Sequence, residues 1–217
     1  MTASPRSESA RRIAESGIIA ILRVDLPVQE IIEMGDALMA SPVAVAEVPL
    51  NTPAALEVIT ALRERYGSHM LMGAGTVRTP AQVRPALDAG AQFLVAPNFD
   101  MGVAMLAKEA DILYIPGVFT PTEVQVAVNA GCRMVKLFPN TLGPAYLRAL
   151  RAPMDDVDFV PTGGVDVGNI AAFAKAGAAA VGVAGALFPQ PWSMPEIILR
   201  ARALRKEWNA GKNLQSD

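Results

Sequence analysis

The feature that most constrains the fold is a regular alternation of short aliphatic runs with longer segments of helical period. Eight runs rich in Val, Ile, Leu and Ala read as buried strands, and they cover 18–22, 43–48, 70–74, 92–95, 112–115, 133–138, 158–161 and 180–183. Between them, apolar residues recur every three or four positions in 28–40, 52–65, 79–89, 100–109, 120–130, 143–151 and 166–176. A strand-helix repeat of this kind predicts a parallel sheet covered by helices.

Local start and stop signals support these helices. A threonine that can cap a helix precedes a proline suited to the first turn at 52–53, 79–80 and 120–121. Glycines that can end a helix follow three of the segments, at Gly90, Gly131 and Gly177.

Eight strand-helix units favour a closed (β/α)8 TIM barrel over an open doubly wound sheet, which would leave two edges to protect. The α/β fold is therefore expected to be one domain over 1–217, with the barrel at about 18–190. A leading helix at about 7–16 is expected to cover the barrel floor, and a terminal helix is expected at about 194–209. Such barrels often run to about 250 residues, so the loops here are expected to be short.

The charge balance limits the class of partner. Nineteen Lys and Arg against 21 Asp and Glu give a net charge of −2, and no basic cluster marks a nucleic-acid or membrane surface. No uncharged apolar stretch reaches the roughly 20 residues that span a bilayer, and the first residues lead into a polar helix rather than a signal peptide. We expect a small-molecule partner and a cytoplasmic location.

Two reactive residue types occur once each. Cys132 excludes an internal disulfide and reads as a small buried strand residue, and His69 reads as a solvated turn residue. A single histidine also excludes histidine-clustered zinc sites. We expect no metal and no cofactor.

Lys136 is the strongest catalytic candidate. It stands alone in the apolar run 134–139, and a lysine in a buried strand must be paired, uncharged or chemically employed. Strand alternation places Met134, Lys136 and Phe138 on one face, with both faces of the strand buried.

Functional groups of such a barrel gather at the carboxyl ends of the strands, where Glu47 and Arg23 also stand. Glu47 is expected to face the interior opposite Lys136. An uncharged amine can attack a carbonyl to form a Schiff base, and a neighbouring carboxylate can move the required protons, which is class I aldolase chemistry. The alternative is a buried structural ion pair. For Arg23, a carboxylate clamp and a solvated strand terminus remain open.

Glycine-rich turns follow three strands. The turn Thr162-Gly163-Gly164 leads into a helix and offers backbone N–H groups to an anion, and 182–185 can supply a second wall. A Gly-Gly turn alone is weak evidence, because turns and close packing also select glycine. In 73–76, Thr76 either contacts substrate or caps a loop.

These segments together resemble the 2-keto-3-deoxy-6-phosphogluconate (KDPG) and 4-hydroxy-2-oxoglutarate (KHG) aldolase family, including its phosphogalactonate branch. The resemblance covers about 12–205 and includes 20–23, 47–52, 73–77, 116–118, 135–139 and 161–165. It implies that Lys136 is the Schiff-base lysine and Glu47 the proton-transferring carboxylate. It further implies a metal-independent, typically trimeric enzyme.

By the same resemblance, the residues implied to line the pyruvate pocket are Thr76, Pro97, Phe138 and Thr162. The phosphate is implied to lie against the turns after the seventh and eighth strands, at Gly163, Gly164, Gly182, Ala184 and Gly185.

Two departures from the family pattern bear on the substrate. Asn51 stands where gluconate-type members often have an arginine, so Arg23 is the expected carboxylate ligand, as in the galactonate branch. Ala184-Gly185 replaces the usual Gly-Ser and removes a hydroxyl donor to phosphate.

The leading hypothesis is reversible cleavage of a 2-keto-3-deoxy-6-phospho sugar acid to pyruvate and glyceraldehyde 3-phosphate. The alternatives are an aldolase for 4-hydroxy-2-oxoglutarate or another unphosphorylated keto acid, and a non-catalytic barrel that binds a sugar-acid phosphate. A metal-dependent aldolase is disfavoured.

Overall fold

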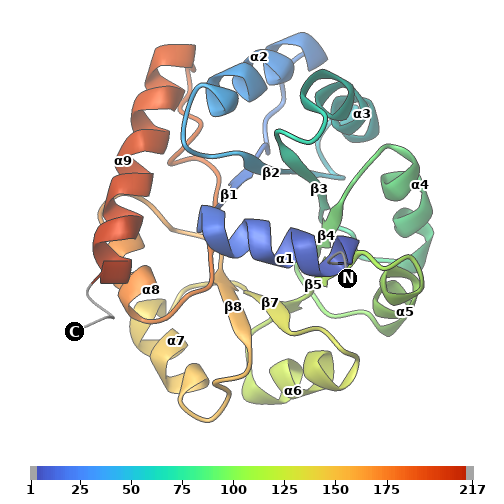
Figure 1. The fold of residues 1–217 in the computed structure, drawn as a ribbon, viewed down its shortest axis with the longest axis vertical. Coiled ribbons are helices and arrows are strands. Elements are labelled where there is room, and N and C mark those ends of the chain that lie inside the picture. Colours follow the sequence, from blue (N-terminus) through green and yellow to red (C-terminus); the bar gives the residue numbers. More distant parts are fainter. Residues whose placement is uncertain (1–3, 214–217) are drawn as a thin grey trace.

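The computed structural model describes residues 4–213 as an α/β fold of parallel strands surrounded by helices (Figure 1). The strands are Ile18–Ile21 (β1), Val45–Pro49 (β2), Leu71–Gly75 (β3), Phe93–Val95 (β4), Leu113–Ile115 (β5), Gly117–Val118 (β6), Met134–Leu137 (β7), Asp158–Pro161 (β8) and Val181–Val183 (β9). The α-helices are Pro5–Ser16 (α1), Val28–Met39 (α2), Ala55–Tyr66 (α3), Val83–Asp88 (α4), Met101–Glu109 (α5), Pro121–Asn129 (α6), Gly143–Arg151 (α7), Ile170–Lys175 (α8) and Met194–Asn213 (α9).

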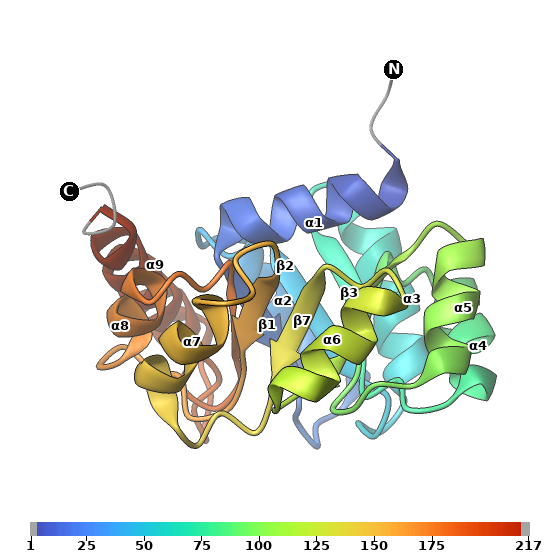
Figure 2. The same cartoon turned by 90° about the horizontal axis from the view of Figure 1, so that it is seen from below.

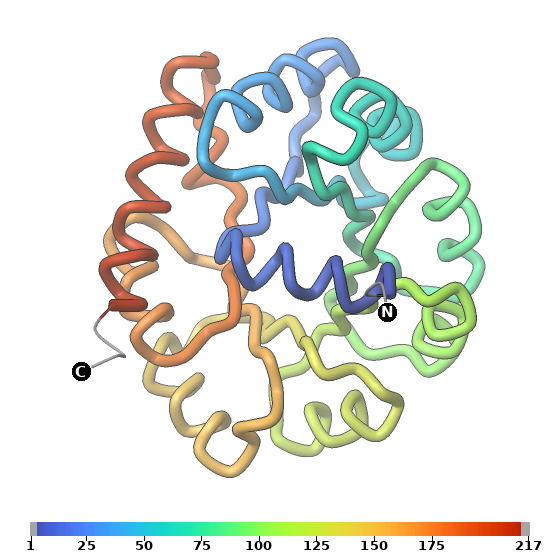
Figure 3. The backbone as a smooth tube through the Cα atoms, in the orientation of Figure 1, coloured from blue at the N-terminus to red at the C-terminus, as the bar shows by residue number. Residues whose placement is uncertain are grey.

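The strands curl in chain order, and the strand-helix units follow one another around the molecule (Figure 3). One sheet has the order β5-β4-β3-β2-β1-β9, and the second has the order β6-β7-β8. Every strand pair is parallel, and an isolated parallel bridge joins Thr162, just after β8, to Gly182 of β9. The expected parallel α/β architecture is confirmed to this extent.

Among residues 4–213, nine strands in two sheets replace the expected single eight-stranded sheet. The expected fifth strand at 112–115 is followed by the unpredicted β6, and only Pro116 separates β5 from β6. Proline has no backbone N–H, so it cannot donate to a ladder and interrupts the strand there. Its carbonyl still accepts a hydrogen bond of 2.8 Å from the Lys136 N–H, which keeps β7 alongside.

Two hydrophobic clusters lie on opposite faces of the strands. The inner cluster takes one residue from most strands, with Val45, Phe93 and Met134 among them, and Ile13 of α1 joins it. Helix α1 lies across one end of the strands, as predicted for a helix that covers the floor (Figure 2). The outer cluster packs the other strand faces against the surrounding helices.

The structure corrects several predicted boundaries. Helix α3 begins at Ala55 rather than Thr52. The Thr52 hydroxyl instead donates a hydrogen bond of 3.5 Å to the Leu22 carbonyl. Helix α8 begins at Ile170, after a turn at 166–169, rather than at Asp166. The segment 79–89 opens with a 3-10 turn, Pro80–Gln82, before α4.

Other boundary signals are confirmed. Thr79 and Thr120 each form a capping box, and Gly90, Gly131 and Gly177 have φ of 97°, 87° and 91°. Over residues 4–213, no helix combines the length and apolarity needed to cross a membrane.

Candidate active site

The candidate site lies one layer above the inner cluster, toward the carboxyl ends of the strands. Val45 and Met134 belong to that cluster, and Glu47 and Lys136 follow them by two residues on the same strand face. Thr162 follows Val160 in the same way at the end of β8. Strand alternation therefore turns these three polar side chains inward, and all three are buried.

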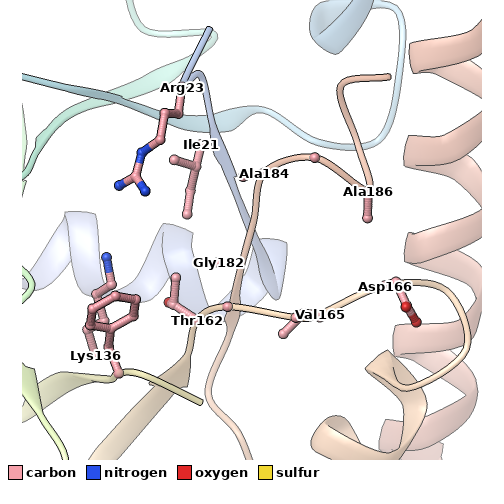
Figure 4. A pocket seen from close by; sticks show the side chains of 13 residues that line it. Ile21, Arg23, Lys136, Thr162, Val165, Asp166, Gly182, Ala184 and Ala186 are labelled. Atoms are coloured by element: carbon pink, nitrogen blue, oxygen red, sulfur yellow. The ribbon is translucent and has the colours of Figure 1, made fainter. Parts of the chain in front are cut away.

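A cavity of about 390 Å³ opens over this layer. The Arg23 guanidinium and the Lys136 amine point into it from opposite sides, with Thr162 beside Lys136 and the β9 end forming another wall (Figure 4). Nine residues that the sequence singled out line it: Arg23, Lys136, Phe138, Thr162, Gly163, Gly164, Gly182, Ala184 and Gly185.

Lys136 is held in surroundings that disfavour its charge. Its residue is 4% exposed, and its Nζ lies 5.0 Å from the centroid of the Phe138 ring. Burial lowers the pKa of Lys136, the nearby Glu47 raises it, and Arg23 lowers it further. A lowered pKa increases the fraction of uncharged amine, which is the nucleophilic form.

Glu47 is not among the residues that line the cavity, and it is 2% exposed. Burial raises the pKa of its carboxyl group, while Lys136 and Arg23 act in the opposite direction. Its Oε2 is buried without a hydrogen-bond partner, and none of the ion pairs among residues 4–213 joins it to Lys136 within 4.0 Å. A structural ion pair needs direct contact and satisfied oxygens, so this geometry argues against that reading.

Arg23 is exposed at the cavity rim, where its planar fork is free to face a carboxylate. It also borders a neighbouring cavity of about 370 Å³ together with Asn51. The two positions that the sequence linked as alternative carboxylate ligands are therefore neighbours in space.

Two glycines of the loop after β8 line the cavity. Gly163 and Gly164 have φ of 103° and 67°, where other residues are strained. At Gly182 an added Cβ would lie 2.6 Å from the Thr162 Oγ1, so glycine is needed there for space. An added Cβ at Gly185 would meet nothing within 4 Å.

Two residues predicted for the pyruvate pocket do not line this cavity. Pro97 lines a second cavity of about 330 Å³ on the other side of Phe138, which borders both. Thr76 is half-buried just beyond β3 with φ of 58°, an unusual conformation for a β-branched residue.

Asp166 is a lining residue that the sequence did not single out as a site residue. Its carboxylate accepts a hydrogen bond of 2.8 Å from the Gly168 N–H, and it lies at the far end of the cavity (Figure 4). Its position two residues after the Gly-Gly turn was the available signal. Val165, Ile21 and Ala186 complete the lining and are apolar.

The remaining reactive residues lie outside the cavity lining. Burial raises the pKa of the Cys132 thiol to about 11, and His69 is exposed in a turn. Among residues 4–213, no group of three or more His, Cys, Asp or Glu side chains is arranged to hold a metal ion.

The chain is similar to known proteins over most of its length. The profile of the family described as KDPG and KHG aldolase matches residues 10–196. A probable 2-dehydro-3-deoxy-6-phosphogalactonate aldolase of Rhizobium meliloti (strain 1021) is 35% identical over 198 residues, which are 90% of this chain and 93% of that protein.

Two solved structures share the fold. A KDPG aldolase from Legionella pneumophila, with pyruvate captured as a covalent carbinolamine intermediate, superimposes with a TM-score of 0.76 at 25% identity, covering 93% of this chain and 97% of that one. A cube-shaped protein cage designed by fusing symmetric oligomeric domains gives a TM-score of 0.86 at 32% identity, covering 92% of this chain and 74% of that one.

Proposed function

The chain belongs to the KDPG and KHG aldolase family, and on that premise we propose that it cleaves a 2-keto-3-deoxy-6-phospho sugar acid reversibly to pyruvate and glyceraldehyde 3-phosphate. The observation that carries the proposal is a buried lysine of lowered pKa on the cavity wall, with a buried carboxyl group near enough to shift that pKa and no direct ion pair between them.

In the first step, the uncharged Lys136 Nζ attacks the C2 carbonyl carbon of the keto acid. The carbonyl oxygen takes up a proton, and the resulting carbinolamine then loses water to leave an iminium ion. Glu47 supplies the proton that the departing hydroxyl needs, which requires a carboxyl group that is protonated near neutral pH. Burial raises the pKa of Glu47 in this direction.

Carbon-carbon cleavage follows from the iminium ion. Glu47, now a carboxylate, accepts the proton of the C4 hydroxyl, the C3–C4 bond breaks as the aldehyde forms, and its electron pair moves into the iminium to give an enamine. Protonation of the enamine at C3 and hydrolysis release pyruvate and restore the lysine amine.

Each end of the substrate is assigned to a part of the cavity, by the charge of the side chains there or by the room that the glycines leave. Arg23 pairs with the C1 carboxylate through its planar fork, and Phe138 and Thr162 pack around the pyruvate portion. The phosphate lies against the backbone of Gly163, Gly164 and the segment 182–185. Pro97 then acts from outside the cavity, through the wall next to Phe138, and Thr76 acts from the loop after β3.

The test is trapping with borohydride in the presence of pyruvate. Reduction of the iminium leaves a stable adduct on Lys136, located by peptide mass spectrometry, and the Lys136→Met variant provides the matched control. An unmodified Lys136 in folded wild-type protein would refute the mechanism. Binding of the sugar acid without turnover would favour the non-catalytic alternative.

A second substrate class is favoured by one observation. The cavity has no side-chain hydroxyl at 184–185, and Asp166 adds a negative group at its far end. An unphosphorylated keto acid such as 4-hydroxy-2-oxoglutarate is shorter and brings less negative charge toward that carboxylate. The ratio of kcat/KM for matched phosphorylated and unphosphorylated substrates separates the two.

We further propose that the two sheets form one closed barrel of eight units within a single domain. The bridge from Thr162 to Gly182 supports closure on one side, and the one-residue gap at Pro116 supports it on the other. Protection of the Gly182 and Lys136 amides from hydrogen exchange tests this closure.

A cytoplasmic homotrimer is the assembly that we propose from the family resemblance. The likeness to a cage built from symmetric oligomeric domains supports an oligomer, as do the exposed Met101 and Met105 of α5. Light scattering of the purified protein measures the subunit number, and cell fractionation tests the location.

A further inference from the structure

We infer that Gly75 is a positioning residue for Glu47, because the space left by its missing side chain is the seat of the Glu47 carboxyl group. The inference deepens the proposed function, since it assigns a role in that reaction to a residue that does not line the cavity. It also explains one part of the segment 73–76 that the sequence left ambiguous.

Strand register brings the two residues together. In the β2–β3 pair, Glu47 lies opposite Gly73 and Pro49 lies opposite Gly75. Glu47 and the diagonal Gly75 therefore occupy the same strand face, and a long side chain that leans along its strand passes over the diagonal position.

The Glu47 carboxyl group occupies the position that a Cβ atom on Gly75 would take. A Cβ placed on Gly75 would lie 1.3 Å from Oε2 of Glu47, 2.4 Å from its Cδ and 3.0 Å from its Oε1. The backbone of Gly75 is not among the left-handed glycines, so other residues could adopt its conformation. Glycine is required at this position for space.

The preceding glycine on the same face serves another purpose. A Cβ on Gly73 would lie 2.5 Å from the Phe93 ring, which belongs to the inner hydrophobic cluster. Gly73 thus admits a core side chain and Gly75 admits the carboxyl group, which makes Gly73 a matched comparison on the same strand.

The seat also distinguishes the two carboxyl oxygens. Oε2 is buried against Gly75 without a hydrogen-bond partner, so it is poorly placed to exchange protons with substrate. Oε1 is the oxygen that lies further from the seat, and we assign it the proton transfers of the proposed reaction.

The direct test is Gly75→Ala, in which the new methyl group must displace the carboxyl group. A displaced general acid-base group lowers the rate by about 100-fold or more, so we expect kcat to fall by about that factor with a smaller change in KM. The pH dependence of kcat should also shift, because the environment of Glu47 changes. Gly73→Ala is expected to lower the melting temperature without shifting the pH dependence of its residual activity.

A double-variant cycle with Glu47→Asp separates positioning from general damage to the strand. Aspartate is one methylene shorter and withdraws from the seat, so adding Gly75→Ala to Glu47→Asp should lower kcat by less than about 3-fold. The same added change should lower the melting temperature less than it does in the wild type. If Gly75→Ala does not fold and the double variant does, the inference is supported.

The inference is overturned if folded Gly75→Ala keeps the wild-type kcat, or if it costs the same factor in both backgrounds. It is also overturned if neither Gly75→Ala protein folds. Because the melting-temperature cycle needs no turnover, it tests the seat even if borohydride trapping on Lys136 fails. Failure of the proposed function is therefore distinguishable from failure of this inference.

Discussion

Replacing both Lys136 and Glu47 with methionine should abolish activity and stabilise the protein. Both side chains are almost completely buried, at 4% and 2% exposed, yet no ion pair joins them among residues 4–213. Methionine has a similar length and the flexibility to fill irregular space, so the exchange removes charge with little change of volume.

The expected gain follows from the desolvation of the two groups. A buried acceptor without a partner, such as Glu47 Oε2, costs about 1–3 kcal/mol. Exchanging buried ionic groups for apolar ones of similar volume is often stabilising by about 1–4 kcal/mol. We expect the free energy of unfolding to rise by about 2 kcal/mol, which for a protein of this size raises the melting temperature by about 4–8 °C.

The gain should depend on pH in a defined way. The pKa of Glu47 is raised from 4.5 by folding, so the wild type loses stability as pH rises from 4.5 through the folded value. The pKa of Lys136 is lowered from 10.5, so the wild type loses stability as pH falls from 10.5 through the folded value. The advantage of the double variant is therefore greatest near neutral pH and smaller toward both limits.

Guanidinium unfolding of wild type and double variant at about pH 5, 7.5 and 10 measures the difference, with circular dichroism as the probe. A double variant that is less stable than wild type at neutral pH would refute the desolvation argument. A difference that is the same at all three pH values would show that the gain comes from packing rather than charge.

Three further predictions concern single residues. Arg23→Lys keeps the charge but loses the planar fork, so KM for the keto acid should rise about 10-fold while kcat stays within about 3-fold in steady-state assays; an unchanged KM would exclude Arg23 from carboxylate binding. Gly185→Ser adds a hydroxyl in open space, so kcat/KM for the phosphorylated substrate should rise about 3- to 10-fold with no change for its unphosphorylated analogue; equal effects on both would place the phosphate elsewhere. Glu47→Gln fills the same seat but carries no titratable proton, so kcat should fall about 100- to 10,000-fold, and retention of wild-type turnover would remove Glu47 from the mechanism.

Much of the architecture is local in origin, which is why the sequence predicted it. The period of apolar residues determines strand or helix within a few neighbours, and caps such as Thr120 and stops such as Gly131 act within one turn. A charged residue inside an apolar strand is also a local feature of the sequence. The immediate neighbours of Lys136 were therefore enough to predict it as a site residue. Where a local signal competes with tertiary contacts it fails, as at Thr52, whose hydroxyl bonds the Leu22 carbonyl instead of capping α3.

By itself, the sequence determined the strand-helix order, the inward faces of the strands and the identity of the polar groups at their ends. Only the tertiary structure decided which of those groups share a cavity, because that depends on the register between strands distant in sequence. Register puts Glu47 over Gly75, leaves Pro97 beyond Phe138 and sets Arg23 opposite Lys136. Desolvation and close packing depend on residues that only the folded chain brings together. The pKa values of the site residues are therefore properties of the tertiary structure.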